Sequence, residues 1–237
     1  MTRKRPNAPT DQWLWGWRVR RAWAVLAKDV RAEYRTRYAV NALFLFALVT
    51  LTALSFATGG TTLTPLLAAV FYWVILFFSV FSSLAQTFVK EAETKTEFFL
   101  KLTAPDDAVF FGKWAFNLIL VALLNIILTP LFVVMLNVSL SEWGIWLLTL
   151  FLGGVGLVST TTLLGALIAA ANVRGALFSV LAFPVLLPLL VTAIRVSETC
   201  LGGTSNFAND DAFLVLGAYA VVSTTASWLL FPFVWRD

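Results

Sequence analysis

Six long apolar runs constrain what this chain can fold into more than any other feature of its sequence. They occupy residues 39–57, 65–89, 113–136, 143–171, 175–194 and 212–235. A helix needs about twenty apolar residues to cross the hydrocarbon core of a bilayer, and each run is about that long. Of the 237 residues, 59% are hydrophobic and 13% are charged, whereas soluble domains have about 25% charged residues. We therefore expect an all-α polytopic membrane protein with six transmembrane helices.

Residues at the ends and in the interior of the runs predict details of these helices. Thr64 followed by Pro65 is typical of a helix start, because threonine caps free amide groups and proline suits the first turn. Pro184 and Pro188 lie inside the fifth run, so we expect that helix to be kinked or locally unwound. Tryptophans near run ends are typical of aromatic belts at the membrane surface; they are Trp143, Trp146, Trp228 and Trp235.

The segment before the first run is predicted to contain an amphipathic helix. Residues 1–10 are basic and contain proline, and we expect them to be disordered. In residues 13–38, Trp23, Val30 and Tyr34 recur at helical spacing, with the basic residues largely on the other side. Such a helix lies in the membrane interface. Two roles fit it: a basic anchor that only sets orientation, or the elbow helix of a transporter subunit.

The distribution of positive charge predicts how the chain is oriented. Among 17 lysines and arginines, all but Arg195 fall in the N-terminal segment, the second and fourth connections or the C-terminal tail. Segments rich in lysine and arginine remain in the cytoplasm, so both termini are predicted to be cytoplasmic, in a bacterial inner membrane. Basic residues beside apolar runs favour lipid headgroups over nucleic acid as their partner. The chain then divides into a cytoplasmic tail with its interfacial helix, residues 1–38, and a transmembrane unit, residues 39–237.

The longest polar interruption, residues 90–113, is predicted to be a contact surface in the cytoplasm. Its sequence, KEAETKTEFFLKLTAPDDAVFFGK, is too short for a domain and too long for a tight turn. Glutamates make it soluble, but charge does not explain the exposed apolar residues Phe98, Phe99 and Leu100 that we expect beside them. These side chains are suited to the groove of a partner protein. The alternative is a solvated charged loop without a partner.

The chain lacks the sequence features of an ATPase and of an ion-coupled carrier. Gly112 and Lys113 are followed by Trp114 and lack the earlier glycine that a phosphate-binding loop requires. The cores of the six runs contain no Asp, Glu, Lys or Arg, whereas ion-coupled carriers place such groups at mid-membrane depth. With no histidine and one cysteine, we predict no metal site and no stable heme ligation. Cys200 is expected to be an exposed, incidental thiol in the outer loop.

Small and polar residues inside the runs are predicted to serve helix packing. Thr161, Gly165 and Ala169 repeat at intervals of four in the fourth run and would form a smooth helix face. Packing within the chain and a subunit interface both fit this pattern. Side-chain amides inside the runs are predicted to form interhelical hydrogen bonds rather than a substrate path; they are Asn41, Gln86, Asn117 and Asn125.

Five features taken together resemble one known family. They are the basic residues 28–37 before the first run, the acidic segment that ends in LKLTAP, the glycine-rich fourth run, NVRG at residues 172–175, and LAFPVLLPLL at residues 181–190. The chain is similar in these respects to heme exporter protein B, the CcmB-type permeases of cytochrome c maturation, over about residues 24–235. One departure is that the polar segment has Lys95, Thr96 and Glu97 where the family commonly has Gly-Ser/Thr-Leu-Glu.

The resemblance implies a six-helix permease of the ABC-2 type that works with a separate ATP-binding cassette subunit. ATP is then expected on that subunit, and heme on heme-handling membrane subunits that load a periplasmic heme chaperone. This chain is not expected to bind either cofactor directly or to be an enzyme. The contacts to the ATPase subunit are predicted to involve residues of the polar segment: Glu93, Glu97, Phe98, Phe99, Leu100, Lys101 and Pro105.

Three functions are open on the sequence alone. The first is a permease subunit that couples ATP hydrolysis to heme export or to release of a heme-loaded periplasmic chaperone. The second is an ABC-2 exporter of a lipid or another amphiphile. The third is a structural membrane subunit without energy coupling. Self-association is compatible with each of them.

Overall fold

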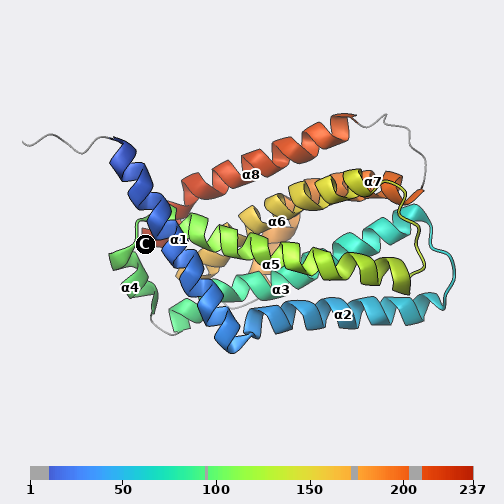
Figure 1. Ribbon diagram of the computed structural model, residues 1–237, viewed down its shortest axis with the longest axis horizontal. Helices are drawn as coiled ribbons and strands as arrows, with labels where there is room; N and C mark the ends of the chain where they lie inside the picture. The colour runs from blue at the N-terminus through green and yellow to red at the C-terminus, as the bar shows by residue number, and fades with distance from the viewer. Residues whose placement is uncertain (1–10, 94–95, 172–175, 203–209, 237) are drawn as a thin grey trace, which may run out of the picture.

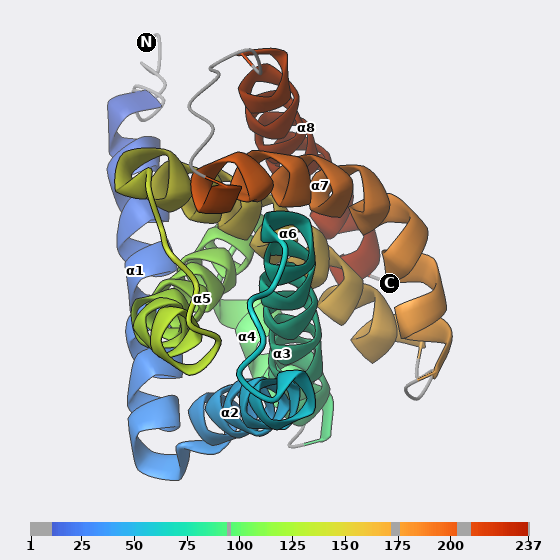
Figure 2. The same ribbon diagram turned by 90° about the vertical axis from the view of Figure 1, so that its right-hand side faces the viewer.

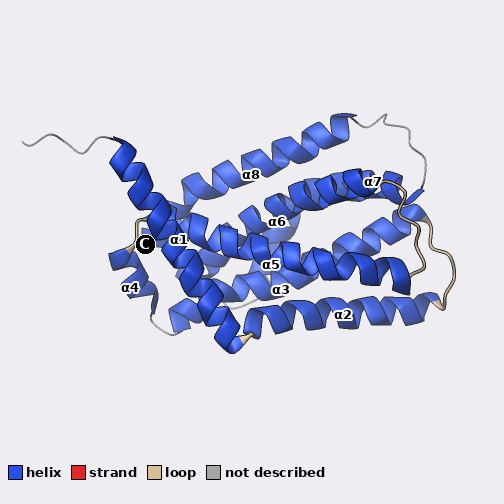
Figure 3. Ribbon diagram, in the orientation of Figure 1, coloured by secondary structure: helices blue, strands red, loops and turns tan. Residues whose placement is uncertain are grey.

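Eight helices make up the described part of the chain. The computed structural model describes the backbone of residues 11–93, 96–171, 176–202 and 210–236, and side chains for 17–83, 100–167, 184–202 and 211–235. The helices are α1 (Asp11–Thr36), α2 (Tyr38–Thr58), α3 (Pro65–Glu93), α4 (Thr96–Thr103), α5 (Asp106–Met135), α6 (Trp143–Ala171), α7 (Ala176–Gly202) and α8 (Asp210–Arg236). These residues contain no strand (Figure 3). The expectations for residues 1–10 and 172–175 lie outside the described residues.

Six of these helices are long and apolar enough to cross a membrane. They are α2, α3, α5, α6, α7 and α8. The expected fold class, all-α with six membrane-spanning helices, is therefore confirmed, and the chain is an integral membrane protein. α1 precedes the first spanning helix, and the short α4 connects the second to the third (Figure 1).

The ends of two spanning helices differ from the predicted runs. α5 begins at Asp106 rather than at residue 113, because Asp106 and Asp107 interact favourably with the positive end of a helix while they interrupt the apolar run. α7 continues to Gly202 rather than ending at residue 194. Arg195 and Cys200 are therefore helical. In both cases a charged residue set the boundary of the predicted apolar run, but the helix continues beyond that residue.

Cys200 is a buried residue of α7 and not an exposed thiol in a loop. Its side chain is fully buried, and Sγ donates to the carbonyl of Val196 at 3.3 Å. The backbone carbonyl of Cys200 accepts from the amide of Ser141 at 3.0 Å. This bond ties the end of α7 to the connection between α5 and α6.

The first two helices meet at a sharp corner. Arg37 separates them with φ of 51°, in the left-handed region that non-glycine residues rarely adopt. The carboxylate of Glu33 accepts from the amide of Val40 at 2.8 Å, which satisfies a free donor at the start of α2. α1 therefore ends before Tyr38, the predicted end, and runs at a steep angle to α2 (Figure 1).

Proline has different effects at the two predicted positions. At the start of α3, the hydroxyl of Thr64 accepts from the amide of Leu67 at 3.3 Å, which confirms the predicted cap before Pro65. Pro184 and Pro188 lie inside α7, which is helical throughout and not unwound. Figure 2 shows that α7 changes direction along its length, as expected where two helical N–H donors are missing.

α6 lies at the centre of the bundle, and α2 and α8 lie at its edges. α6 contacts α3, α5, α7 and α8. The indole of Trp73 in α3 lies against Gly153, where a Cβ atom would stand 2.3 Å from Cη2 of the ring. The same indole donates to the hydroxyl of Ser197 in α7 at 2.8 Å. Trp73 therefore joins three helices at one level.

Several polar side chains inside the bundle bond between helices, while many hydroxyls bond back to a carbonyl of their own helix. Asn117 donates to Thr162 Oγ1 at 3.0 Å, joining α5 to α6, and Asn125 Oδ1 accepts from the hydroxyl of Tyr72 in α3 at 3.0 Å. The predicted interhelical role of these two amides is confirmed. Asn41 is exposed and forms no such bond with another described residue. The side chain of Gln86 lies outside the described residues.

Two of the four tryptophans expected in aromatic belts are core residues instead. Trp146 is 1% exposed and packs edge-on against Tyr72, with ring centroids 4.8 Å apart. Trp235 is also buried, and it stacks on Phe231 at 5.5 Å. Their rings fill space between helices, which a position near the end of a run does not reveal. Trp143 and Trp228 are exposed.

We predict that Gly153→Ala lowers the melting temperature of the detergent-solubilised protein, because the new Cβ overlaps the Trp73 ring. Overpacking of this kind costs about 1–3 kcal/mol. Gly154→Ala is the matched control, since its Cβ would meet only Val121 Cγ1 at 3.6 Å. Alanine favours a helix over glycine by about 1 kcal/mol, so the control should melt at the same or a higher temperature. Equal melting temperatures for both variants would contradict the packing described for Trp73.

Candidate functional site: the α4 corner

α4 and three segments around it form one connected unit at one end of the bundle. We call it the α4 corner: α4, the first turns of α5, the part of α1 that crosses them, and the end of α8. Figure 1 shows α4 beside the C-terminus, with α1 crossing α5 close by. Its apolar side chains form a small cluster separate from the main core. The polar segment predicted at residues 90–113 falls mostly within this unit.

α4 is held to the bundle by Leu100. This side chain is 7% exposed and belongs to the cluster that includes Val25 of α1, Phe110 of α5 and Phe231 of α8. Burying a leucine side chain contributes about 1.5–3 kcal/mol. A helix of eight residues is too short to be stable alone in water, so this anchor accounts for its place.

Two further contacts fix both sides of α4. The ammonium of Lys101 lies 5.3 Å from the centroid of the Trp235 ring, a cation–π distance. At the end of the helix, the guanidinium of Arg21 donates to the backbone carbonyl of Thr103, which satisfies a carbonyl that the helix leaves free. α4 is therefore tied to α8 through one contact and to α1 through the other.

Asp107 joins α1 and α8 at the start of α5. Its Oδ2 accepts from Arg18 of α1 at 3.1 Å, and its Oδ1 accepts from the indole of Trp228 in α8 at 3.1 Å. Pro105 precedes this turn with extended backbone, φ −68° and ψ 151°, and its carbonyl accepts from the amides of the first helical turn. The turn between α4 and α5 is therefore tied to α1 and α8 as well as to the helix that follows it.

α1 crosses α5 in close contact at Gly112. A Cβ atom there would stand 2.7 Å from Cβ of Val25 and 2.9 Å from the carbonyl oxygen of Ala22. One residue further, Lys113 is 2% exposed and its ammonium lies 3.5 Å from Oδ2 of Asp29, which is 12% exposed. Glycine thus permits the approach of the two helices, and a buried ion pair fixes its register.

The amphipathic helix α1 has three faces rather than two. Ala22, Val25 and Asp29 face α5, while Trp23 and Tyr34 of the predicted apolar stripe are 69% and 79% exposed. The predicted stripe is thus free to enter the bilayer interface, in agreement with an interfacial helix. Most basic residues occupy the remaining exposed face. The sequence pattern showed the apolar and basic faces, but not the third.

The predicted coupling residues differ in where the structure places them. Leu100 was expected to be exposed and to dock on a partner, but it is buried in the chain's own apolar cluster and is not available for docking. Lys101 contacts Trp235, and Pro105 immediately precedes α5. Glu93, Glu97, Phe98 and Phe99 lie in helical backbone, and their side chains are outside the described residues.

Sequence reasoning missed Leu102, the described apolar residue of α4 that faces outward. It is 71% exposed, although Leu100 two positions earlier is buried. Residues two apart in a helix point to different sides. The pattern of the segment alone does not show which side faces the bundle, because Phe98, Phe99, Leu100 and Leu102 are all apolar.

The other predicted positions lie away from the α4 corner. Pro184 and Pro188 are exposed on the outer side of α7. Thr161 is buried and donates to the carbonyl of Leu157 in its own helix at 2.7 Å, and Gly165 is buried as well. The side chain of Ala169 lies outside the described residues.

Comparison with known proteins identifies one family. A family model described as CcmB protein matches residues 20–235, which is nearly the whole chain. No curated protein sequence matches the chain closely enough to count as a relative.

We predict that Lys113 and Asp29 are energetically coupled, because both are shielded from water and lie 3.5 Å apart. A double-mutant cycle with Lys113→Met and Asp29→Asn, followed by unfolding in mixed detergent micelles, should give a coupling free energy of about 0.5–3 kcal/mol. The same cycle for Arg18 and Asp107, whose side chains are 52% and 29% exposed, should give less than about 1 kcal/mol. Additive effects for Lys113 and Asp29 would show that the pair does not hold α1 on α5.

Proposed function

Because this chain belongs to the CcmB protein family, we propose that it couples ATP hydrolysis in a separate subunit to heme export or to release of a heme-loaded periplasmic chaperone. Membership makes it a membrane component of the heme export and cytochrome c maturation system. The coupling, the ATPase subunit and the heme-handling subunits are the parts that we propose. The position of the chain in the bacterial inner membrane with cytoplasmic termini is proposed from the distribution of lysine and arginine.

The observation that carries the proposal is the exposed Leu102 on a firmly anchored short helix. α4 is attached to the bundle through Leu100, and on its other side it presents Leu102, 71% exposed. A large apolar side chain on a rigid helix is a suitable anchor for the groove of a soluble partner. The docking residues predicted from the sequence also include Phe98, four positions before Leu102.

The contacts of α4 support its role in transmitting motion. A load applied to α4 reaches α8 through Lys101 and Trp235, α1 through Arg21 and Thr103, and α5 through the short turn at Pro105. α8 and α5 both pack on the central α6. Displacement of α4 by a nucleotide-driven partner would therefore also displace α5 and α8, because no flexible loop separates α4 from these two spanning helices.

The buried pair of Lys113 and Asp29 gives the corner a fixed pivot. It lies two turns into α5, beyond the contact at Gly112, where α1 and α5 touch most closely. Close-packed side chains move as rigid units rather than deforming continuously. We infer that α1 moves with the start of α5, so the exposed apolar stripe of α1 shifts in the membrane interface when α4 is displaced.

We predict that Leu102→Asp lowers co-purification of the ATPase subunit by about tenfold or more, because losing an apolar anchor costs about 2 kcal/mol. The abundance of the chain in the membrane should not change, since Leu102 is exposed. Phe98→Asp and Glu97→Arg should act in the same direction, and holocytochrome c should fall with the ATPase subunit. The measurement is the amount of ATPase subunit recovered with the tagged chain from solubilised membranes.

Asn137→Asp provides the control for added negative charge, because Asn137 is exposed at the opposite end of α5 from α4. It should recover the ATPase subunit in normal amounts. Normal recovery with all three α4 variants would remove the coupling assignment. Recovery of the native complex without any ATPase would favour the structural membrane subunit instead.

A further inference from the structure

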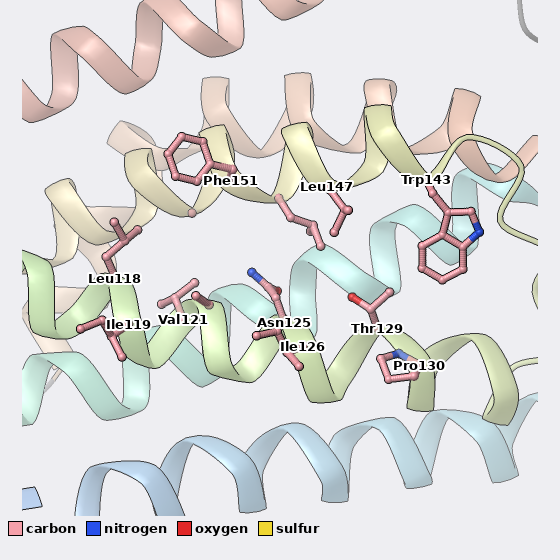
Figure 4. A pocket seen from close by; sticks show the side chains of 13 residues that line it. Leu118, Ile119, Val121, Asn125, Ile126, Thr129, Pro130, Trp143, Leu147 and Phe151 are labelled. Carbon is pink, nitrogen blue, oxygen red and sulfur yellow. The ribbon is translucent and has the colours of Figure 1, made fainter.

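A groove of about 620 Å³ lies between α5 and α6, away from the α4 corner. Its wall on α5 runs from Leu118 to Pro130, and its wall on α6 includes Trp143, Leu147 and Phe151. Figure 4 shows these side chains on the two helices, with Asn125 pointing from α5 into the space between them. Except for Asn125 and Thr129, the lining is apolar.

The groove faces hydrocarbon rather than water. Both helices are membrane-spanning segments, and the rim residues Ile126 and Leu147 are 70% and 59% exposed. At 1.5 Å per residue, the stretch from Leu118 to Pro130 is about 18 Å long, roughly the thickness of one leaflet. Whatever fills the groove must therefore be a component of the membrane.

Asn125 provides a hydrogen-bond donor in the groove that no described residue accepts. Its Oδ1 accepts from the hydroxyl of Tyr72 at 3.0 Å, and the hydroxyl of Thr129 lies 2.9 Å from the same Tyr72 oxygen. This chain of bonds occupies the amide oxygen and fixes the orientation of the side chain. The amide nitrogen has no hydrogen-bond acceptor among the described residues. An unpaired donor in hydrocarbon costs several kcal/mol.

Pro130 provides a backbone acceptor next to this donor. Proline has no N–H, so the carbonyl of Ile126, four residues earlier in α5, lacks its helical donor. Ile126 and Pro130 both line the groove. Within one turn of helix, the groove therefore combines a free side-chain donor with a backbone acceptor that needs a donor.

From this pair we infer that the groove binds a transmembrane helix of another polypeptide, which places a polar side chain opposite Asn125. Asparagine, glutamine, serine and threonine each carry both a donor and an acceptor, as the groove requires. A saturated acyl chain has neither, and the ester groups of a phospholipid lie at the membrane surface, not at the depth of Asn125. Interhelical bonds of this kind are a common means of helix association in membranes.

The proposed function supplies an occupant for the groove, because it includes further membrane-spanning subunits. We therefore assign the partner helix to a different polypeptide, and binding of a second copy of this chain is an outcome of the test. The inference rests on the proposed function in one respect, namely that this polypeptide is another membrane subunit of the same complex.

The test places a photo-crosslinking amino acid at Ile126 or Leu147 in the full complex in native membranes. The expected result is an adduct whose fragment mass spectrum identifies a membrane-spanning segment of a different polypeptide that co-purifies with the chain. Leu45 in α2 and Val222 in α8 are the control positions, because they are 62% and 65% exposed and lie outside the groove. They should give less than about a tenth of that adduct.

Two substitutions separate direct contact from loss of stability. Ala122→Trp fills the groove and should reduce the adduct by about tenfold or more, whereas Ala53→Trp on the exposed side of α2 should not change it. Asn125→Ala should reduce it roughly three- to fifteenfold, the range expected for one interhelical bond in a membrane. Tyr72→Phe removes the internal bond to Asn125 but keeps the donor in the groove, and should have a smaller effect than Asn125→Ala.

Several results would overturn the inference. These are adducts only with lipid, adducts only with a second copy, no adduct at either groove position, or an unchanged adduct in Ala122→Trp. A loss in Tyr72→Phe as large as in Asn125→Ala would also count against direct contact. The ATPase subunit should remain bound to Ala122→Trp, because the groove is remote from α4. If the ATPase subunit were absent from every preparation, the proposed function would be contradicted. The crosslink would still show whether another polypeptide occupies the groove.

Discussion

Hydrocarbon offers no partner to a polar atom, and the interior of this protein is arranged around that constraint. Several indoles, amides and hydroxyls in the bundle bond to a neighbouring helix: Trp73 donates to Ser197, Trp114 donates to Ser159, and Ser159 lies within bonding distance of Thr224. Each such bond fixes both the rotation and the height of two helices, which apolar packing against lipid-like side chains does weakly. The central α6 takes part in two of them. The bundle is therefore specified by a few directional contacts, and its apolar surface serves mainly to keep it in the membrane.

The α4 corner meets the same constraint at the edge of the membrane by different means. There, charged groups are paired: Asp107 with Arg18 and Trp228, and Lys113 with Asp29. α1 is consequently part of the bundle on one face while its other faces remain suited to lipid and headgroups. The corner and the groove between α5 and α6 share α5 but lie toward its opposite ends. One helix thus connects the proposed site for a soluble partner with the inferred site for a membrane partner.

The hydrophobic pattern was sufficient to predict the helices, because a spanning helix has a length set by the bilayer. The pattern was misleading where charged residues lie inside a helix. Asp106 and Asp107 lie outside the predicted apolar run, but they favour the start of α5. In the α4 corner, the segment was found from its polarity, but the outward residue was not: Leu100 and Leu102 have the same chemistry, and their burial depends on α1 and α8. Nor does any local signal pair Lys113 with Asp29, which lies 84 residues earlier. Contacts of this kind are set by tertiary packing alone.

The distance in sequence between α1 and its binding surface bears on how the protein is made. The partners of α1 in α5 follow 84 and 89 residues later, and at about 5–20 residues per second a ribosome needs roughly 4–18 seconds to produce them. During that time the N-terminal helix lacks α5, the helix on which it mainly packs, and the sharp bend at Arg37 keeps it out of line with α2. Its aromatic stripe and arginines let it wait on the membrane surface. Docking onto α5 then closes the first half of the molecule as a late step of biogenesis, after the first two spanning helices are in place.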